Sequence, residues 1–394
     1  MKFRYAVLGA GRQGTAAAYD MARWGEAARI LLADASEEAA ERAAERVNRL
    51  VGRPAAEARQ LDATDLAAVE RLLAEVDSCL SAVPYYYNLD ITQAAIRART
   101  HLCDLGGHTG IAREQHALDA QARGAGLSIV PNCGQVPGMG TSLMVYAMEL
   151  LDRAEEVYLW DGGLPCHPQP PFQYSLTFNI EGLTNEYAEP AVFLRDGVLV
   201  EVAPMSEPEE VEFPEPIGRL EAFVTGGGLD TMPWTYRGRL RTLQNKTLRY
   251  PGHYAQLKAY YDLGLWGREP VSVRGLPVVP RDVFHTLFEP QVRLADGQDM
   301  ILVRVHATGT RAEGPAIAEV ELIDYHDPET GFTAMERCTG WSAAIVAEMA
   351  ARGELPKGSA GVETQVPAGP YVRELQRRGL RVRSTVSTAE VSRA

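Results

Sequence analysis

The sequence predicts an α/β protein in which an N-terminal parallel sheet precedes a second α+β domain with a mixed or antiparallel sheet. Three observations support this fold class. Up to about residue 130, short apolar runs alternate with helix-forming segments, as they do in parallel sheets. Beyond Pro131, strand-like alternation is interrupted by many prolines and glycines, which is typical of mixed or antiparallel sheets. The length of 394 residues exceeds what one hydrophobic core usually holds.

The first part is predicted to alternate strand and helix throughout, and each strand ends at a polar or glycine-containing turn. Strands are expected at 3–8, 29–33, 58–61, 78–83, 101–105 and 127–130. Helices are expected at 15–23, 37–50 with Ser36 as the N-cap, 66–75, 91–99 and 112–123. Because ligands of such sheets bind beyond the carboxyl ends of the strands, the turns after these strands should form one binding edge.

The second part begins with a turn-rich loop at 132–140 and an apolar helix at 143–151. Strands are expected from Val157 onward, including 174–178, 191–194, 198–202, 237–243, 292–294, 300–308 and 316–323. Two helices are expected near the end, at 340–353 and 371–378. The last dozen residues are polar, so we expect them to be loose.

Composition and charge restrict the classes of partner. The chain is 46% hydrophobic and 23% charged, which is typical of a soluble globular protein. Its formal net charge of −13 argues against nucleic acid and anionic membranes as partners. No apolar stretch is long enough to span a membrane, and the N-terminus runs directly into a strand, so we expect a cytoplasmic protein.

The cysteines predict neither a disulfide framework nor a metal site. The five cysteines are widely spaced, odd in number and contain no C-x-x-C pair, which suits reduced thiols. Cys166 and His167 are adjacent, but no second pair at ligand spacing accompanies them. We therefore expect no metal.

The first predicted strand leads directly into Gly9-Ala10-Gly11-Arg12-Gln13-Gly14, a G-x-G-x-x-G sequence, and a helix follows. In the dinucleotide-binding Rossmann fold, Gly9 would allow the tight turn, Gly11 would admit a pyrophosphate, and Gly14 would let helix and strand pack closely. The first-turn amides of the helix would then face the phosphates. Arg12 and Gln13 belong to the same cofactor-binding loop.

The second predicted strand ends at Asp34, about twenty residues after the glycine loop, where the fingerprint places a ribose-binding acid. A carboxylate there accepts hydrogen bonds from ribose hydroxyls and repels a 2′-phosphate, which favours NAD while leaving NADP possible. Further cofactor contacts are expected from the ends of the next strands. These are Asp62, Ala82, Val83 and Pro84.

Several strings in the chain are not demanded by any general fold rule. They are V-P-Y at 83–85, H-L-C-D-L-G at 101–106, C-G-x-x-P-G-M at 133–139, E-G-L-x-x-E-Y-x-E-P-A at 181–191, K-T-L-R-Y-P-G-H at 246–253 and T-G-W-S-A-A-I-V-A at 339–347. In these strings the chain resembles the saccharopine dehydrogenase-like oxidoreductases, and within them it is most similar to the L-lysine 6-dehydrogenases. The resemblance implies an NAD(P)-binding Rossmann domain at 1–131 and a substrate-binding and oligomerisation domain at 132–338. It also implies C-terminal helices at 339–380 that return to the first domain.

The resemblance implies oxidation of the ε-carbon of L-lysine by hydride transfer to nicotinamide. Hydrolysis of the imine would give ammonia and 2-aminoadipate 6-semialdehyde, which can cyclise to piperideine-6-carboxylate. Saccharopine-reducing members typically carry an arginine-bearing segment after Glu-Ala-Tyr, whereas here Glu221-Ala222-Phe223 continues into residues 224–228 without an arginine. This departure favours a small amino acid. Saccharopine or carboxynorspermidine dehydrogenation, and a dinucleotide-binding sensor without turnover, remain the alternatives.

The resemblance also supplies candidate substrate residues. Tyr85 and Asp104 match positions that line the substrate or nicotinamide pocket, and Asp104 could hold the amine or simply cap a loop. Arg249 could bind the lysine carboxylate, and Lys246 or His253 could assist proton transfer. A structural turn explains that basic cluster equally well.

Two further residues complete the predicted substrate site. Glu181 could bind an ammonium group or cap a helix, and Gln135 should lie in the cleft between the domains. The expected substrate is a small amino acid, and the expected assembly is a homodimer or homotetramer.

Overall fold

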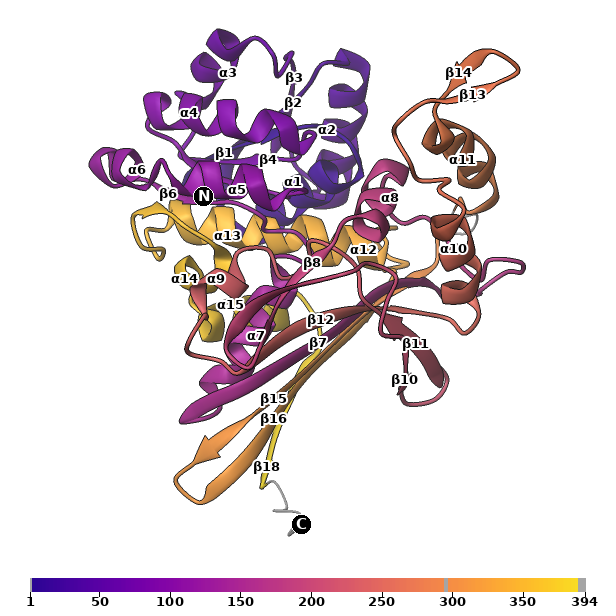
Figure 1. The fold of residues 1–394 in the computed structure, drawn as a ribbon. Coiled ribbons are helices and arrows are strands. Elements are labelled where there is room, and N and C mark those ends of the chain that lie inside the picture. Colours follow the sequence, from indigo (N-terminus) through magenta and orange to yellow (C-terminus); the bar gives the residue numbers. More distant parts are fainter. Residues whose placement is uncertain (1, 294–296, 389–394) are drawn as a thin grey trace.

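The computed structural model describes residues 2–293 and 297–388 (Figure 1). The N-terminal sheet has seven parallel strands in the order β17-β6-β5-β4-β1-β2-β3. They are β1 (Phe3–Leu8), β2 (Ala27–Asp34), β3 (Ala56–Gln60), β4 (Ser78–Ser81), β5 (His101–Asp104), β6 (Ser128–Val130) and β17 (Gly358–Ser359). The six strands predicted here are confirmed. The order in which successive strands are added to the sheet reverses between β1 and β4, and such switch points are where these sheets bind ligands.

Helices connect these strands. They are α1 (Arg12–Trp24), α2 (Glu37–Val51), α3 (Leu66–Leu73), the 3₁₀ turn η1 (Tyr85–Tyr87), α4 (Asn88–Ala98), α5 (Thr109–His116) and α6 (Asp119–Ala125). The predicted N-cap of α2 is present, because the Ser36 hydroxyl accepts a bond from the Ala39 amide at 3.2 Å. The single helix predicted at 112–123 is instead the two short helices α5 and α6.

The second sheet has nine strands. They are β7 (Arg153–Pro165), β8 (Ala191–Arg195), β9 (Val198–Val202), β10 (Glu209–Glu212), β11 (Arg219–Phe223), β12 (Thr242–Arg249), β15 (Asp299–Arg311), β16 (Gly314–Tyr325) and β18 (Val382–Thr388). All pairings are antiparallel except β7 with β12, which confirms a mixed sheet. The apolar helix α7 (Met139–Glu149) packs on β7, β15 and β16.

Four expectations for the second part were wrong. Residues 174–178 and 292–293 form no strand, and Leu176 makes a single bridge with Arg293, while residue 294 lies outside the described residues. The strand expected at 237–243 begins at Thr242 and continues to Arg249. The C-terminal residues 382–388 form β18 along β16 instead of being loose, and residues 389–394 lie outside the described part.

Most of the remaining helices form two groups. Around one end of the second sheet lie α8 (Ile180–Ala188), α10 (His253–Asp262), α11 (Pro280–Phe288) and η2 (Glu289–Gln291), with the hairpin β13 (Val271–Val273) and β14 (Leu276–Val278). Helix α9 (Met232–Thr235) lies apart from them (Figure 1), where Thr231 and Thr235 donate to Glu363 of the C-terminal segment. The C-terminal group is α12 (Ala334–Glu336), the π-helical turn η3 (Arg337–Trp341), α13 (Ser342–Ala351), α14 (Val362–Gln365) and α15 (Ala368–Arg377). Among the described residues, no helix is both long and apolar enough to cross a membrane.

The C-terminal helices lie against the N-terminal sheet, as the yellow helices of Figure 1 show. Helix α13 contacts β4, β5 and α1. A buried ion cluster reinforces this packing, because Arg378 bonds Asp20 of α1 at 2.6 Å and Glu348 of α13 at 2.8 Å. Breaking one member of such a cluster would leave an unpaired buried charge. The cluster therefore fixes α13 and α15 beneath the sheet.

Candidate active site

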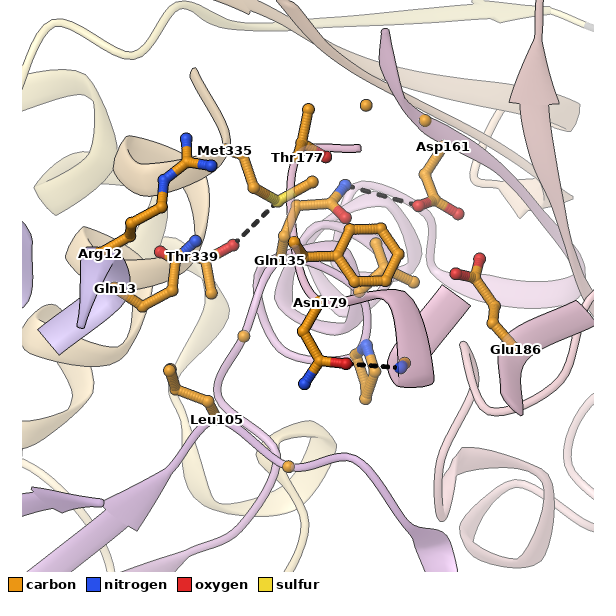
Figure 2. A pocket seen from close by; sticks show the side chains of 18 of the residues that line it. Arg12, Gln13, Leu105, Gln135, Asp161, Thr177, Asn179, Glu186, Met335 and Thr339 are labelled. Carbon is orange, nitrogen blue, oxygen red and sulfur yellow. Dashed lines mark hydrogen bonds between the residues drawn. The ribbon is translucent and has the colours of Figure 1, made fainter. Parts of the chain in front are cut away.

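A cavity of about 560 Å³ lies between the carboxyl edge of the first sheet and the second sheet (Figure 2). The glycine loop and the ends of β4 and β5 line one side, and β7, α8 and β12 line the other. The lining residues are Gly11, Arg12, Gln13, Gly14, Ala82, Leu105, Gly106, Gly134, Gln135, Val136, Pro137, Asp161, Gly162, Gly163, Thr177, Phe178, Asn179, Gly182, Glu186, Thr247, Arg249, Met335 and Thr339.

The glycine loop has the geometry that a bound dinucleotide requires. Gly9 has φ +99°, and a side chain there would lie 2.7 Å from the Ala82 carbonyl oxygen. At Gly14 an added Cβ would lie 1.8 Å from the Gly9 carbonyl oxygen. At Gly11, by contrast, a Cβ would meet no described atom within 4 Å, so this backbone faces open cavity at the start of α1. A pyrophosphate fits at this helix N-terminus.

The other predicted cofactor residues lie along the same edge. The Asp34 carboxylate accepts the backbone amides of Ala10 at 2.8 Å and Ser36 at 2.9 Å, which fixes it beside the loop. Asp62 is exposed after β3, and hydrogen bonds from Thr64 lower its pKa. Ala82 lines the cavity, and Val83 and Pro84 follow it without joining the lining.

Arg12 and Gln13 both line the cavity next to the C-terminal segment. The Arg12 Nε donates to Glu336 at 2.8 Å, so the guanidinium is fixed at the cavity wall and its charge is balanced. Figure 2 shows these two side chains on the opposite side of the cavity from Asp161 and Glu186.

Arg249 provides the cationic group at the far side. It is 3% exposed and lies on β12, and its guanidinium donates from Nε to the Tyr187 hydroxyl at 2.6 Å and from Nη1 to the Leu248 carbonyl at 2.8 Å. These bonds use two of the five N–H groups of an arginine. The guanidinium can therefore bind a carboxylate that enters the cavity.

Two acids that the sequence did not single out face each other near Arg249 (Figure 2). Asp161 of β7 is 7% exposed, and its Oδ2 accepts a long bond of 3.5 Å from Gln135. Burial, and then the charge of Glu186, raise the pKa of Asp161 to about 7. Glu186 of α8 accepts from Thr247 at 3.1 Å and from Thr225 at 3.4 Å, and burial raises its pKa although Arg249 opposes this.

His253 does not line the cavity, contrary to its predicted proton-transfer role. It is 1% exposed, and its ring nitrogens lie 3.3 Å from the Phe172 carbonyl (Nδ1) and 3.1 Å from the Tyr187 hydroxyl (Nε2). Because a carbonyl only accepts, Nδ1 carries the hydrogen and Nε2 accepts from Tyr187. Burial, and then Arg249, lower the pKa of His253 to about 3. His253 is thus a neutral positioning residue for the Tyr187–Arg249 pair.

Lys246 points away from the cavity. Successive side chains of a strand alternate between faces, so Thr247 and Arg249 line the cavity while Lys246 lies on the other face. Its ammonium donates to the Glu207 carbonyl at 2.9 Å and pairs with Glu209 at 3.1 Å. The predicted catalytic role of Lys246 therefore has no geometric support.

Asp104 is buried behind the cavity wall. Its Oδ1 accepts the amides of Gly106 at 2.8 Å and Asn132 at 2.9 Å, and its Oδ2 accepts from Gln115 at 2.8 Å. Burial raises its pKa. Asp104 holds in place the loop that places Leu105 and Gly106 in the lining, which agrees with the loop-capping alternative, and its role in holding the amine stays a prediction.

Glu181 and Tyr85 also lie outside the lining. Glu181 is half-exposed and pairs with Arg268 at 2.7 Å and Arg281 at 3.1 Å in a surface cluster. Glu186 of the same helix lines the cavity instead. The Tyr85 ring stacks on His108 with centroids 5.6 Å apart, so its substrate role remains a prediction.

Sequence signals for the missed acids exist. Asp161 is the one charged residue in the apolar stretch 157–165, which indicates a special environment on a buried strand. Glu181 and Glu186 are five residues apart on a helix, which puts them on different faces at roughly 100° per residue. Cys79, Cys103, Cys133 and Cys338 are free thiols, and among the described residues no group of three or more His, Cys, Asp or Glu is placed to hold a metal ion.

A parallel sheet with this glycine loop, facing an arginine and two acids across one cavity, has the architecture of a dinucleotide-binding Rossmann domain opposite a polar pocket. Residues 5–130 match the family model for the saccharopine dehydrogenase NADP binding domain, and residues 134–380 match that for the saccharopine dehydrogenase C-terminal domain. The chain belongs to the saccharopine dehydrogenase family, as its motifs predicted.

Individual relatives agree with this family. The chain is 26% identical over 220 residues to the saccharopine dehydrogenase [NADP(+), L-glutamate-forming] of Pyricularia oryzae, covering 53% of this chain and 48% of that protein. It is 26% identical over 223 residues to the mitochondrial alpha-aminoadipic semialdehyde synthase of Mus musculus, covering 52% of this chain and 23% of that protein. The chain thus matches about half the length of the first relative and about a quarter of the second.

A solved structure shares the whole fold. The apo saccharopine dehydrogenase (L-Glu forming) of Saccharomyces cerevisiae superposes with a TM-score of 0.78 at 18% identity, covering 98% of this chain and 100% of that one. The predicted Rossmann sheet with a second mixed-sheet domain is confirmed.

Proposed function

We propose that this protein catalyses the NAD-dependent oxidative deamination of the ε-amino group of L-lysine to 2-aminoadipate 6-semialdehyde and ammonia. The observation that carries the proposal is the charge arrangement of the cavity. Arg249, Asp161 and Glu186 lie in the same cavity as the glycine loop, and together they suit the carboxylate and ammonium groups of an amino acid.

The balance of charge favours lysine over saccharopine. With both acids ionised, Arg249, Asp161 and Glu186 carry one net negative charge, while Arg12 is balanced by Glu336. Lysine, with two ammonium groups and one carboxylate, is a net cation. Saccharopine, with three carboxylates and two amino groups, is a net anion. A site of net negative charge attracts the first and repels the second.

The segment after β11 supports the same choice. Residues 224–228 contain no basic side chain, and Thr225 instead donates to Glu186 at 3.4 Å. No arginine of this segment is therefore available for the additional carboxylates of saccharopine. Because the relatives are named as saccharopine dehydrogenases, saccharopine is the alternative substrate that must be tested.

The cofactor preference rests on Asp34. The matched domain model and the Pyricularia relative are both named for NADP, so a dinucleotide is expected and the choice between the two forms is open to test. Here the fixed carboxylate of Asp34 is followed by Glu37 and Glu38 in the first turn of α2. Three acids at this edge would repel a 2′-phosphate, so we propose NAD.

The roles of the chain follow from the geometry. When bound, the nicotinamide supplies the hydride acceptor. The open face at Gly11 and the first-turn amides of α1 would hold the pyrophosphate. Arg249, held by Tyr187, binds the substrate carboxylate and so fixes its distance from the dinucleotide side of the cavity. Glu186 and Asp161 receive the ammonium end.

We also propose a homodimer or homotetramer. The hairpin of β13 and β14 pairs with no other strand among the described residues, and it exposes Val271, Val273 and Leu276. An isolated two-stranded hairpin is marginally stable in water, which supports a partner at this site.

A substrate panel tests the function. L-Lysine, L-ornithine, saccharopine and carboxynorspermidine are each offered with NAD and with NADP, and reduced cofactor and ammonia are both measured. We expect reduction of NAD with L-lysine and release of ammonia in equal amount. Oxidation of saccharopine without ammonia release would assign the alternative, and binding of NAD without oxidation of any amine would indicate a sensor.

A further inference from the structure

We propose that Asp161 is the proton acceptor for the substrate amine and that Glu186 is its positioning partner, so that the two carboxyl groups share the proton after transfer. This inference rests on the proposed amine oxidation, because an ammonium group must lose a proton before its carbon can give up a hydride.

The first observation is an unsatisfied acceptor inside the cavity. The Oδ1 atom of Asp161 is buried and has no hydrogen-bond partner among the described residues. The Thr177 hydroxyl, which also lines the cavity, likewise has no partner among the described residues. Buried polar atoms are normally paired, so these two oxygens indicate a ligand that brings hydrogen-bond donors. An ammonium group brings three.

The second observation is that few side chains in the cavity wall can accept a proton. Among the described residues that line it, the ionisable side chains are Arg12, Asp161, Glu186 and Arg249. An arginine does not accept a proton at physiological pH, so only the two acids can. Lys246, His253 and Asp104, which were also candidates, are not among the lining residues.

The two acids differ in position. Gln135, at the centre of the cavity in Figure 2, reaches Asp161, whereas Glu186 bonds Thr225 and Thr247. Both threonine hydroxyls donate to Oε1 of Glu186, whereas Asp161 accepts only the 3.5 Å contact at Oδ2, so hydrogen bonds stabilise the carboxylate of Asp161 less and leave it the more basic of the two. This difference assigns proton transfer to Asp161.

Every charged group that faces Asp161 is accounted for. Glu186 of α8 raises its pKa and Arg249 of β12 lowers it. The other neighbours are uncharged: the amides of Gln135 and Asn245, and the two register partners of Asp161, Thr247 on β12 and Val303 on β15. Two facing carboxylates are stable together when a cation lies between them or a proton is shared. The substrate ammonium first supplies the cation between the two carboxylates, and after proton transfer it has supplied the proton that they share.

The step itself is balanced. One N–H bond of the ammonium breaks, an O–H bond forms at Oδ1, and the electron pair of the broken bond remains on nitrogen. That lone pair then assists departure of the hydride from the adjacent carbon to the nicotinamide of the proposed reaction. The proton stays on the acid pair until solvent removes it.

The test compares Asp161→Asn and Glu186→Gln with Asp230→Asn. Asp230 is the matched control, because it is also 7% exposed and burial raises its pKa to about 7 as well, yet it lies outside the cavity lining. The measurements are kcat and KM for L-lysine across pH 6 to 10 and, separately, L-lysine binding to the enzyme–NADH complex by fluorescence.

We expect wild-type kcat/KM to rise with pH through about 7, because the ionised form of Asp161 is active. D161N should lower kcat by about 100-fold or more and should no longer show the midpoint near pH 7. Its residual rate should instead rise as the pH approaches the pKa of the free substrate amine. E186Q should move the midpoint to lower pH, since it removes the like charge. D230N should keep the wild-type midpoint. Formate should restore part of the activity of D161A.

The outcomes separate the two proposals. If D161N retains kcat within tenfold of wild type and the same pH midpoint, the inference is overturned while lysine oxidation stands. If L-lysine binds the NADH complex but is not oxidised, the proposed function fails. In that case the affinity of the NADH complex for L-lysine is compared across pH. If the affinity rises with pH in the wild type but not in D161N, the role of the acid pair is supported. If the affinity depends on pH equally in both proteins, the inference is overturned.

Discussion

Removal of the Tyr187 hydroxyl tests whether Arg249 is held for substrate binding. This hydroxyl accepts from the Arg249 Nε at 2.6 Å and contacts the His253 Nε2 at 3.1 Å in a fully buried setting. Tyr187→Phe therefore leaves a charged donor and a ring acceptor unpaired. Each buried group without its partner costs about 1–3 kcal/mol, so we expect the two together to lower the free energy of unfolding by about 2–6 kcal/mol.

The kinetic consequence should fall on substrate binding. A misplaced guanidinium forfeits a charged hydrogen bond of about 1.5–3 kcal/mol, which corresponds to roughly a 10- to 150-fold loss in kcat/KM for L-lysine. Most of this loss in kcat/KM should appear as a higher KM, because the substrate carboxylate is bound equally in the ground state and the transition state. The dissociation constant of NAD should not change, since the glycine loop lies on the opposite side of the cavity.

Tyr174→Phe is the matched control for this experiment. Its hydroxyl is buried without a hydrogen-bond partner among the described residues, and its ring packs on the Arg249 guanidinium at 5.3 Å. Removing this hydroxyl breaks no described bond, so stability and KM should stay close to wild type. Denaturant unfolding and steady-state kinetics measure both variants. Equal behaviour of Y187F and Y174F would refute the positioning of Arg249 by Tyr187.

Two further predictions concern the cofactor loop. Asp34→Ala should lower the ratio of kcat/KM with NAD to that with NADP by at least about tenfold, because one negative charge near the 2′-position is removed; an unchanged ratio in steady-state assays would contradict the role of Asp34. Gly14→Ala should abolish NAD binding and lower the melting temperature, since its Cβ would lie 1.8 Å from the Gly9 carbonyl oxygen. Gly124→Ala in α6 is the control, because a Cβ there meets no described atom within 4 Å, and it should stabilise the folded protein by about 1 kcal/mol. Equal melting temperatures of the two variants in calorimetry would contradict the close packing at Gly14.

The fold of the first part could be predicted because its signals are local. The strand before Gly9, the acid at Asp34 and the N-cap at Ser36 each depend on residues close in sequence. Strand β18 could not be predicted this way. Its residues are mostly exposed and polar, and it forms only because β16, about sixty residues earlier, offers an edge.

The site could be predicted only in part, because its residues meet through tertiary structure. Gln135 and Arg249 were predicted and line the cavity. Lys246 was grouped with Arg249 because both lie in the K-T-L-R-Y-P-G-H string, and alternation along strand β12 places them on opposite faces. Asp161 and Glu186 lie on different elements, β7 and α8, so their pairing could not be read from spacing.

The most direct test of the account is the stoichiometry of one reaction. The purified protein is given L-lysine and NAD at a pH above the midpoint expected for Asp161, and reduced cofactor and ammonia are measured in the same sample. The account predicts one NADH and one ammonia for each lysine consumed. Formation of NADH or NADPH from saccharopine, with L-lysine left unchanged, would contradict it.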